Sequence, residues 1–249
     1  MAAFTHAVAL GVDTLELDLG MTRDGVLVVA HDPRVDGALC DGDATLLGAR
    51  IKDLSYQQLA TLDCGSKRHP RFPHQVPVPG ARMPRLEQVL DLLGRHPGLR
   101  ASVEIKTFPE QPRETHPPAR FAAALMNLLA ARDVAPRVTV QSFDPRALAA
   151  VRARAAPGTP RPILAALVRR RAEFEPALRA TGATILSPRH TVLRRRDAAS
   201  LRARGVRVIP WTVNAPARMR TLVEWGVDGL ITDRPDLLLR LLQRRRGLW

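Results

Sequence analysis

Cysteine, lysine and aromatic residues are all scarce in this chain of 249 residues. The two cysteines, Cys40 and Cys64, are too few for a disulfide framework, and no CxxC pair or histidine and cysteine spacing typical of zinc sites occurs. One bridge between these two cysteines stays open as an alternative that no sequence pattern supports. Aromatic residues make up only 4%, so Trp211, Trp225 and Trp249 stand out.

Long apolar stretches are missing as well. No apolar run reaches transmembrane length, so we expect no integral membrane segment. The first ten residues, MAAFTHAVAL, lack the basic flank and the long apolar stretch of a signal peptide. As written, the chain is therefore expected in the cytoplasm. A true start further upstream that carries an export signal would instead make it periplasmic or secreted.

Acidic residues are outnumbered by basic ones, at 24 Asp+Glu against 38 Lys+Arg and a formal charge of +14. Three of those 38 are lysines (Lys52, Lys67 and Lys106), so the other 35 are arginines. A nucleic-acid-binding surface would explain the charge, but no nucleic-acid motif occurs and no aromatic residues are interleaved with the basic runs. We therefore expect no nucleic-acid partner and attribute the arginines to codon bias. The positive field still favours an anionic substrate.

From about residue 101 onward, strand-like apolar runs alternate with helical patterns. This βα alternation at short intervals predicts a parallel sheet with helical crossovers. Gly205 and Gly226 stand where a helix should stop before the next strand. The expected strands are residues 101–106, 138–143, 163–168, 184–187, 206–213 and 229–232, and the expected helices include 120–132, 145–154, 197–204, 215–225 and 235–245.

The N-terminal part adds one strand and a hairpin. In residues 13–19, leucines alternate with Thr14, Glu16 and Asp18, which is a strand signal. The connection to the next apolar run is far too short for a parallel crossover. Residues 26–30 should therefore return antiparallel, with Asp24-Gly25 in the turn, and bring His31 back toward the acidic residues.

Counting parallel strands without the hairpin arm gives seven, whereas a closed (β/α)8 barrel needs eight. We therefore predict an α/β fold, a TIM-type (β/α)8 barrel whose first strand is missing. The chain also opens inside an uncapped amphipathic helix, which suggests missing residues upstream of Met1. Residues 33–82 are rich in Pro, Gly and polar residues, with one helix expected at 53–63. We interpret them as an inserted segment over one end of the barrel, within a single domain spanning residues 1–249.

Three carboxylates are predicted to meet at the carboxyl ends of two parallel strands. Glu16 and Asp18 lie two residues apart and share a face, as do Glu104 and Lys106 in the VEIK stretch. Barrel sites lie at these strand ends. Hard divalent cations take oxygen ligands, and a lysine ammonium suits a phosphate oxygen. Taken singly, each alternation also fits a half-exposed strand, and Lys106 beside Glu104 also fits a plain salt bridge.

Six segments resemble the glycerophosphodiester phosphodiesterase family. They run in the family's order and cover nearly the whole chain. Any one of them is modest, but together they are highly specific. The segments are AAFTHAVALGVDTLELDLGMTRDGVLVVAHD (2–32), MPRLEQVL (83–90), VEIK (103–106), VQSFD (140–144), PWTVN (210–214) and GVDGLITDRP (226–235).

The resemblance implies the fold and the activity together. It implies a TIM-type barrel with an insertion after the hairpin, and hydrolysis of glycerophosphodiesters such as glycerophosphocholine to glycerol 3-phosphate and an alcohol. That activity belongs to lipid and glycerol metabolism. The resemblance also implies a divalent metal cofactor, Mg²⁺ or Ca²⁺, because Glu16, Asp18 and Glu104 match the family's metal carboxylates.

Three further residues match functional positions of the family. His31 matches one of two catalytic histidines that share the roles of general acid and base. Lys106 matches the phosphate-binding lysine, and Trp211 matches an aromatic residue that packs against the substrate. As a lone loop histidine, His31 would instead be a hydrogen-bonded surface residue, and Trp211 would instead be core packing.

The chain departs from the family at its start. The family opens with a strand carrying His-Arg-Gly and then Pro-Glu-Asn-Thr, and neither motif occurs here. The partner histidine, the adjacent arginine and a glutamate near the metal are therefore missing, and His6 and His190 do not match the missing position. We interpret this as a start codon placed too far downstream. The alternatives are an inactive truncated remnant that binds a phosphodiester or a metal, and a basic nucleic-acid-binding protein. No pattern predicts the oligomeric state.

Overall fold

A single curved sheet organises the molecule. The structure, a computed structural model, describes residues 1–69, 72, 75–155 and 158–246. Within these residues seven strands form one sheet in the order β2-β1-β3-β4-β5-β6-β7. The β1–β2 pair is antiparallel, and all other neighbours are parallel. The strands are β1 (Thr14–Met21), β2 (Leu27–Val29), β3 (Arg100–Ile105), β4 (Val138–Ser142), β5 (Ile163–Val168), β6 (Ile185–Pro188) and β7 (Arg207–Val208).

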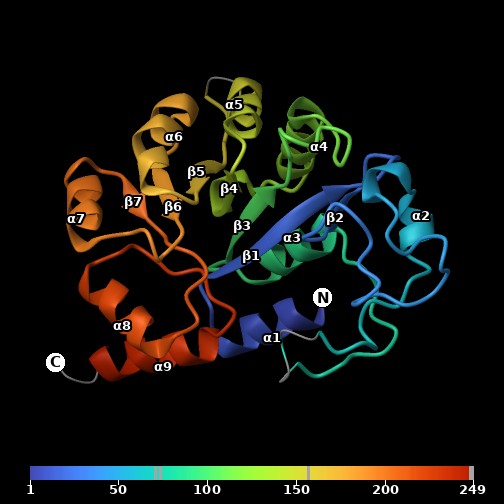
Figure 1. The fold of residues 1–249 in the computed structure, drawn as a ribbon, viewed down its shortest axis with the longest axis horizontal. Coiled ribbons are helices and arrows are strands. Elements are labelled where there is room, and N and C mark those ends of the chain that lie inside the picture. The colour runs from blue at the N-terminus through green and yellow to red at the C-terminus, as the bar shows by residue number, and fades with distance from the viewer. Residues whose placement is uncertain (70–71, 73–74, 156–157, 247–249) are drawn as a thin grey trace.

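Helices follow the parallel strands and cover the outside of the sheet (Figure 1). In that view α4 to α7 line one rim, and α1, α8 and α9 line the opposite one. The helices are α1 (Ala2–Leu10), α2 (Tyr56–Leu59), α3 (Leu86–Arg95), α4 (Pro118–Ala131), α5 (Pro145–Arg154), α6 (Phe174–Thr181), α7 (Arg195–Ala203), α8 (Pro216–Glu224) and α9 (Pro235–Arg246). Among the described residues, none of these helices combines the length and apolar character needed to cross a membrane.

The predicted alternation of strands and helices is confirmed. The helix expected at 145–154 has these bounds in α5, and α8 lies within the expected 215–225. Gly205 and Gly226 follow α7 and α8 with φ values of 75° and 74°. This left-handed conformation is the one in which glycine ends helices most readily.

Two expected elements are shorter than predicted, and a third is not assigned as a strand. The helix over 53–63 is reduced to α2, which Ser55 caps. The strand over 206–213 is reduced to β7, since Pro210 has no N–H to donate to a ladder. No strand is assigned to residues 229–232, although Ile231 N donates to the Pro210 carbonyl at 3.0 Å and Val213 N to the Ile231 carbonyl at 2.9 Å. This segment therefore runs beside 210–213 as an irregular last member of the barrel wall.

The barrel is open on one side in the described part of the chain. The sheet ends at β2 and β1 on one edge and at β7 on the other, and no ladder joins residues 229–232 to β1. A cavity of about 2010 Å³ occupies the interior and this open side, bordered by residues of α1 and α9 as well as by strand residues. Its size reflects the opening, because a closed barrel of this kind is filled by side chains.

The main hydrophobic core lies between the sheet and its helices. Leu15, Leu17 and Leu19 of β1 are at most 3% exposed and belong to this core. The residues that alternate with them point the other way, into the barrel interior. The strand alternation thus separates a face that packs the fold from a face that carries polar chemistry.

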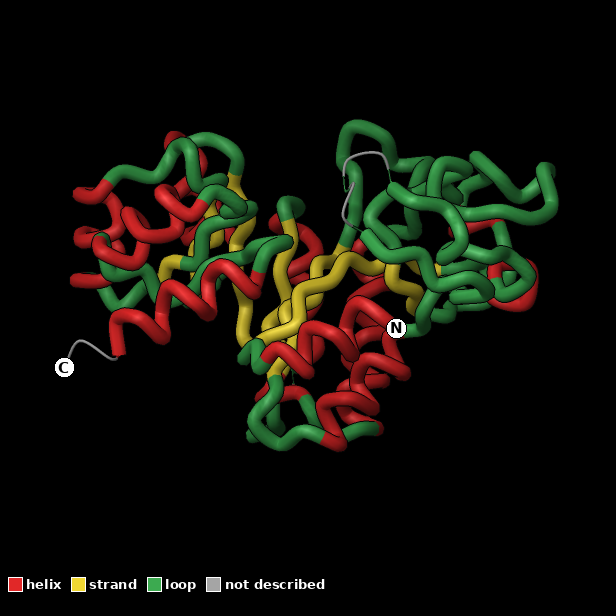
Figure 2. Tube along the Cα trace, turned by 90° about the horizontal axis from the view of Figure 1, so that it is seen from below, coloured by secondary structure: helices red, strands yellow, loops and turns green. Residues whose placement is uncertain are grey.

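Residues 33–82 form a loop-rich excursion with a small core of its own. Figure 2 shows these loops gathered at one end of the molecule, where Figure 1 places α2. Its buried apolar side chains, together with Val28 and Met83 from its flanks, make a second cluster separate from the main core. The predicted loop-rich character of this segment agrees with the arrangement, although its one expected helix, over 53–63, is only the short α2.

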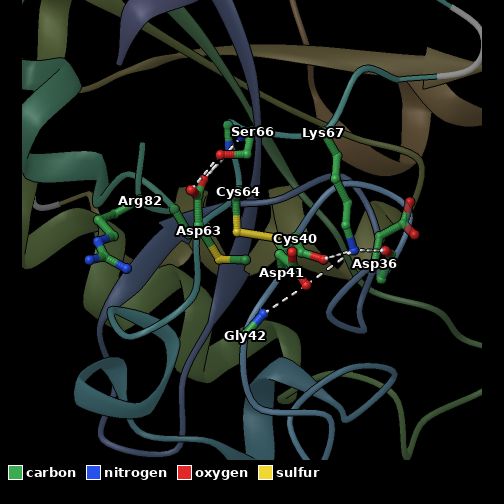
Figure 3. The surroundings of a disulfide bond; sticks show 12 residues. Asp36, Cys40, Asp41, Gly42, Asp63, Cys64, Ser66, Lys67 and Arg82 are labelled. Atoms are coloured by element: carbon green, nitrogen blue, oxygen red, sulfur yellow. Dashed lines mark hydrogen bonds and ion pairs between the residues drawn. A yellow bond between two sulfur atoms is a disulfide. The ribbon is translucent and has the colours of Figure 1, made fainter. Parts of the chain in front are cut away.

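A disulfide joins Cys40 to Cys64 within the excursion (Figure 3). This is the bridge for which the sequence offered no support. Asp41 and Asp63, next to the cysteines, exchange two backbone hydrogen bonds of 2.7 and 2.9 Å. Lys67 Nζ donates to the carbonyl of Cys40 at 3.0 Å. Both cysteines line the cavity, so the bridge braces one wall of it.

Candidate active site

The three predicted carboxylates converge in the barrel interior. Asp18 and Glu104 are direct partners in the parallel ladder of β1 and β3. Glu16 lies two residues before Asp18 and therefore shares its face. One oxygen of each carboxylate lies within 4.8 Å of the others. This spacing suits a single hard cation with oxygen ligands, so the residues present fit a divalent metal.

Burial and mutual repulsion act on these acids. Burial, followed by the charges of Asp18 and Glu104, raises the pKa of Glu16 to about 8. Glu104 is only 6% exposed, and burial raises its pKa to about 8 as well, with Lys106 opposing and Asp18 adding to the effect. A divalent cation would relieve this repulsion and favour the ionised carboxylates.

Lys106 supplies the positive charge within this cluster. Its Nζ lies 3.2 Å from Asp18 Oδ1 and 3.2 Å from Glu104 Oε1. Burial alone would lower the pKa of Lys106, but the two neighbouring carboxylates outweigh it and raise the pKa. The lysine therefore stays charged. One ammonium beside three carboxylates leaves the cluster net negative when all are ionised, which again favours a cation.

Two residues without an assigned site role act on Glu16, Gln141 through a hydrogen bond and Asp233 through its negative charge. Gln141 Nε2 donates to Glu16 Oε1 at 2.7 Å, and Gln141 is 1% exposed. The charge of Asp233 adds to the rise in the pKa of Glu16. The carboxylate of Asp233 itself accepts a hydrogen bond of 2.7 Å from Asn214 Nδ2. Both residues lie in segments that resemble the family, but no local spacing pattern distinguishes them. Their proximity to Glu16 depends on the barrel bringing distant strands together.

His31 lies at the end of the hairpin arm, as predicted. The backbone N of Ala30 donates to the Asp18 carbonyl at 3.0 Å, which ties the hairpin to β1 beside the acids. The imidazole Nδ1 lies 2.9 Å from Asp32 Oδ1, and the side chain is 68% exposed. Within the described residues the ring has no contact with the three carboxylates. His31 and Glu16 nevertheless line the same cavity.

Trp211 lies at the mouth of the barrel and has a partner for each part of its side chain. Its Nε1 donates to the Ser187 carbonyl at 2.8 Å. Its ring meets Phe143 edge to face, with centroids 5.3 Å apart. Part of the ring is therefore used in packing, and the half-exposed remainder is available to a ligand.

The arrangement can bind a phosphodiester. The three carboxylates are spaced to hold a cation, the ammonium of Lys106 can donate to a phosphoryl oxygen, and the imidazole of His31 can give or take a proton. Known proteins carry the same combination of fold and segments. The sequence profile of the glycerophosphoryl diester phosphodiesterase family matches residues 1–237. The chain belongs to this family. The resemblance carried by the six sequence segments is thereby confirmed.

Curated relatives agree with the family assignment. This member of the glycerophosphoryl diester phosphodiesterase family is 30% identical over 244 residues to a glycerophosphodiester phosphodiesterase of Bacillus subtilis (strain 168), covering 94% of this chain and 78% of that one. It is also 30% identical over 251 residues to a glycerophosphodiester phosphodiesterase of Caldanaerobacter subterraneus subsp. tengcongensis, covering 98% and 91%. The family and these relatives make the chain a phosphodiesterase.

Solved structures confirm the fold of this family member. A crystal structure assigned to the same family, from Silicibacter pomeroyi DSS-3, matches with a TM-score of 0.85 and 27% identity over 97% of this chain and 87% of that one. An Oleispira antarctica phosphodiesterase in complex with the product sn-glycerol-3-phosphate matches with a TM-score of 0.78 and 18% identity, over 97% and 89%. The second likeness concerns the fold alone.

Proposed function

We propose that this chain hydrolyses glycerophosphodiesters to glycerol 3-phosphate and an alcohol, with a divalent cation held by Glu16, Asp18 and Glu104. The observation that carries the proposal is the convergence of three carboxylates within 4.8 Å in a member of this family. The small-molecule substrate agrees with the names of the relatives and with the product bound in the Oleispira antarctica enzyme.

The cation is Mg²⁺ or Ca²⁺ in this proposal, because both take carboxylate oxygens. When bound, it supplies positive charge against the phosphoryl oxygens. Gln141 keeps the carboxylate of Glu16 in place through its 2.7 Å hydrogen bond. The raised pKa values of Glu16 and Glu104 mean that ligation releases protons.

Lys106, His31 and Trp211 act on the substrate in this proposal. The ammonium of Lys106 binds a phosphoryl oxygen and stabilises the charge that develops as phosphorus becomes five-coordinate. His31 gives a proton to the leaving alkoxide or takes one from the attacking hydroxyl. Asp32 Oδ1, 2.9 Å from Nδ1 of His31, orients the ring. Trp211 packs its half-exposed ring against the substrate at the mouth of the barrel.

An assay of glycerol 3-phosphate release from glycerophosphoethanolamine and glycerophosphocholine tests the proposal. We expect turnover that EDTA abolishes and that excess Mg²⁺ or Ca²⁺ restores. Glu104→Gln should abolish the metal-dependent activity, because it removes a ligand charge without removing volume. Glu110→Gln, at an exposed position outside the site, is the matched control and should leave the activity unchanged.

Two outcomes would contradict the proposed function. Metal binding without turnover of any glycerophosphodiester would identify the chain as the inactive remnant considered above. Turnover that is indifferent to EDTA and to Glu104→Gln would show that the carboxylates do not hold a catalytic cation.

A further inference from the structure

A second group of polar and aromatic side chains lies at the mouth of the barrel, away from the carboxylates. Gln141, Ala165, Ser187 and Ile209 line the cavity from β4, β5, β6 and the segment after β7. The residues that follow at or just beyond the ends of these segments are Phe143, Arg169, Arg189 and Trp211.

Backbone contacts hold these four positions side by side. Val168 pairs with Pro188, and Arg189 N donates to the Val168 carbonyl at 2.9 Å, so Arg169 and Arg189 follow neighbouring strands at the same level. Arg189 in turn forms a parallel bridge with Trp211. The ends of β5 and β6 therefore carry Arg169 and Arg189 side by side at the mouth of the barrel. Next to them lie Phe143 and Trp211, which we call the aromatic wall.

Arg169 is stacked on this aromatic wall. Its guanidinium carbon lies 3.6 Å from the centroid of the Phe143 ring, and that ring meets Trp211 edge to face. The nearest acid along the chain, Glu173, accepts hydrogen bonds from the backbone N of Arg169 and from the side chain of Arg170. In the part of the chain that the structure describes, the guanidinium of Arg169 has no carboxylate partner. A planar cation stacked in this way keeps its edge donors free for a bidentate anion.

The stacking also determines what the aromatic wall cannot bind. The face of an aromatic ring is the usual recognition surface for a quaternary ammonium group. At Phe143 the guanidinium already occupies a ring face, and its charge repels a second cation. Lys106 does not duplicate this role, because its ammonium lies 3.2 Å from both Asp18 and Glu104 at the metal end of the site.

We propose that Arg169, supported by Arg189, binds the alcohol headgroup of the substrate and selects glycerophosphodiesters whose alcohol carries a carboxylate or a phosphate. This inference rests on the proposed function, and it assigns the headgroup side of the same site. The phosphodiester group binds at Lys106, and the anionic headgroup extends toward β5 and β6. Choline headgroups are disfavoured, because the guanidinium of Arg169 covers a face of Phe143 and repels a second cation beside Trp211.

Three substrates separate the charge of the headgroup from its size. Glycerophosphoserine and glycerophosphoethanolamine differ by one carboxylate, and glycerophosphocholine carries a quaternary ammonium group in place of the primary ammonium of the ethanolamine compound. We expect kcat/KM for the serine compound to exceed that for the ethanolamine compound by about tenfold, as for one charge-assisted hydrogen-bonded pair. Arg169→Gln should remove this preference and raise kcat/KM for the choline compound, because the face of Phe143 becomes accessible. Arg169→Lys should keep only part of the preference, since an ammonium cannot stack and bind bidentately.

The ethanolamine compound and a neighbouring variant serve as controls. Arg170→Gln removes an equal charge one residue away, from a side chain that is 82% exposed, and should leave all three values unchanged. An unchanged kcat/KM of Arg169→Gln for glycerophosphoethanolamine would show that the variant is folded with an intact metal end. Equal serine to ethanolamine ratios in wild type and Arg169→Gln, or a wild-type preference for choline, would overturn the inference and leave the proposed function standing. Failure to hydrolyse any of the three compounds would overturn both.

Discussion

The balance of charge around Lys106 is the main feature of the site at the scale of single residues. Its ammonium contacts Asp18 and Glu104 at equal distances of 3.2 Å. A cation bound by the same carboxylates would compete for these oxygens and free the ammonium for a phosphoryl oxygen. In the proposed function, the salt bridge and phosphate binding are therefore two alternative states of the Lys106 side chain.

Replacing Lys106 by methionine should lower kcat/KM by about 100-fold or more, the effect of removing one donor aimed at developing charge. Methionine keeps the length of the side chain, so the packing around it changes little. Steady-state kinetics at saturating metal provides the measurement, and Lys52→Met, a lysine paired with Asp53 outside the site, provides the control. Equal activity of Lys106→Met and wild type would show that Lys106 does not contribute to catalysis.

The three carboxylates of this site were predictable from the sequence, but the residues that act on them were not. Alternation along β1 and β3 placed Glu16, Asp18 and Glu104 on one interior face, and the ladder register brings them together. Gln141 and Asp233 were not assigned, because the hydrogen bond of the one and the electrostatic effect of the other on Glu16 depend on the curvature of the whole sheet. That curvature has no local sequence signature. The functional roles of all six assigned residues, including His31 and Trp211, remain predictions.

At the scale of elements, the excursion over residues 33–82 is held by the disulfide and by Asp63. The carboxylate of Asp63 accepts hydrogen bonds from Gly65, Ser66 and Gly80, and the Ser66 hydroxyl is the largest cause that lowers the pKa of Asp63. With so little regular structure, the excursion depends on such local bonds. It also lines the cavity, so in the proposed function its order affects substrate binding.

Reduction of the Cys40–Cys64 bridge should loosen the excursion before the barrel unfolds. A bridge across a sequence separation of 24 contributes about 3 kcal/mol in the loop-entropy account. Hydrogen exchange with and without reductant is the measurement, and we expect faster exchange in residues 36–69 while β3 and β4 stay protected. The Cys40→Ser, Cys64→Ser double variant should exchange as fast as the reduced protein, and reductant should not change its exchange rates. Exchange that is equally protected with and without the bridge would contradict this role.

Element boundaries were predictable where local signals agreed. Proline at the first position and an Asp144 cap fixed α5, which starts and ends as expected. The 53–63 pattern gave only α2, because residues 60–65 turn to pair Asp63 with Asp41 and to bring Cys64 to Cys40. The disulfide was not predictable, since two isolated cysteines carry no pairing information. That residues 1–249 form a single domain with this insertion also remains a prediction.

At the scale of the whole molecule, site chemistry and stability are linked. The barrel interior holds Glu16, Asp18 and Glu104 close together, and in the proposed function a bound cation would favour their ionised forms. Since the pKa values of Glu16 and Glu104 are raised to about 8, the folded chain binds protons more tightly than the unfolded chain when no cation is present. Without metal, stability should therefore fall as pH rises from about 4.5 through about 8.

Urea unfolding at pH 6 and pH 9, in EDTA and in excess Mg²⁺ or Ca²⁺, measures this linkage. We expect the cation to stabilise the chain more at pH 9 than at pH 6, because at pH 9 ligation costs no proton release. The Glu16→Gln, Glu104→Gln double variant should lose both the pH dependence in EDTA and the effect of the cation. A larger increase in the free energy of unfolding at pH 6 than at pH 9 on adding the cation would contradict this linkage.

A crystal of the protein soaked in Mn²⁺, which accepts the oxygen ligands of Mg²⁺ and Ca²⁺, tests the central claim most directly. We predict one anomalous scattering peak within about 2.6 Å of an oxygen from each of Glu16, Asp18 and Glu104, on the side of the cavity that His31 lines. A peak held by other residues, or by only one of these three, would contradict the account.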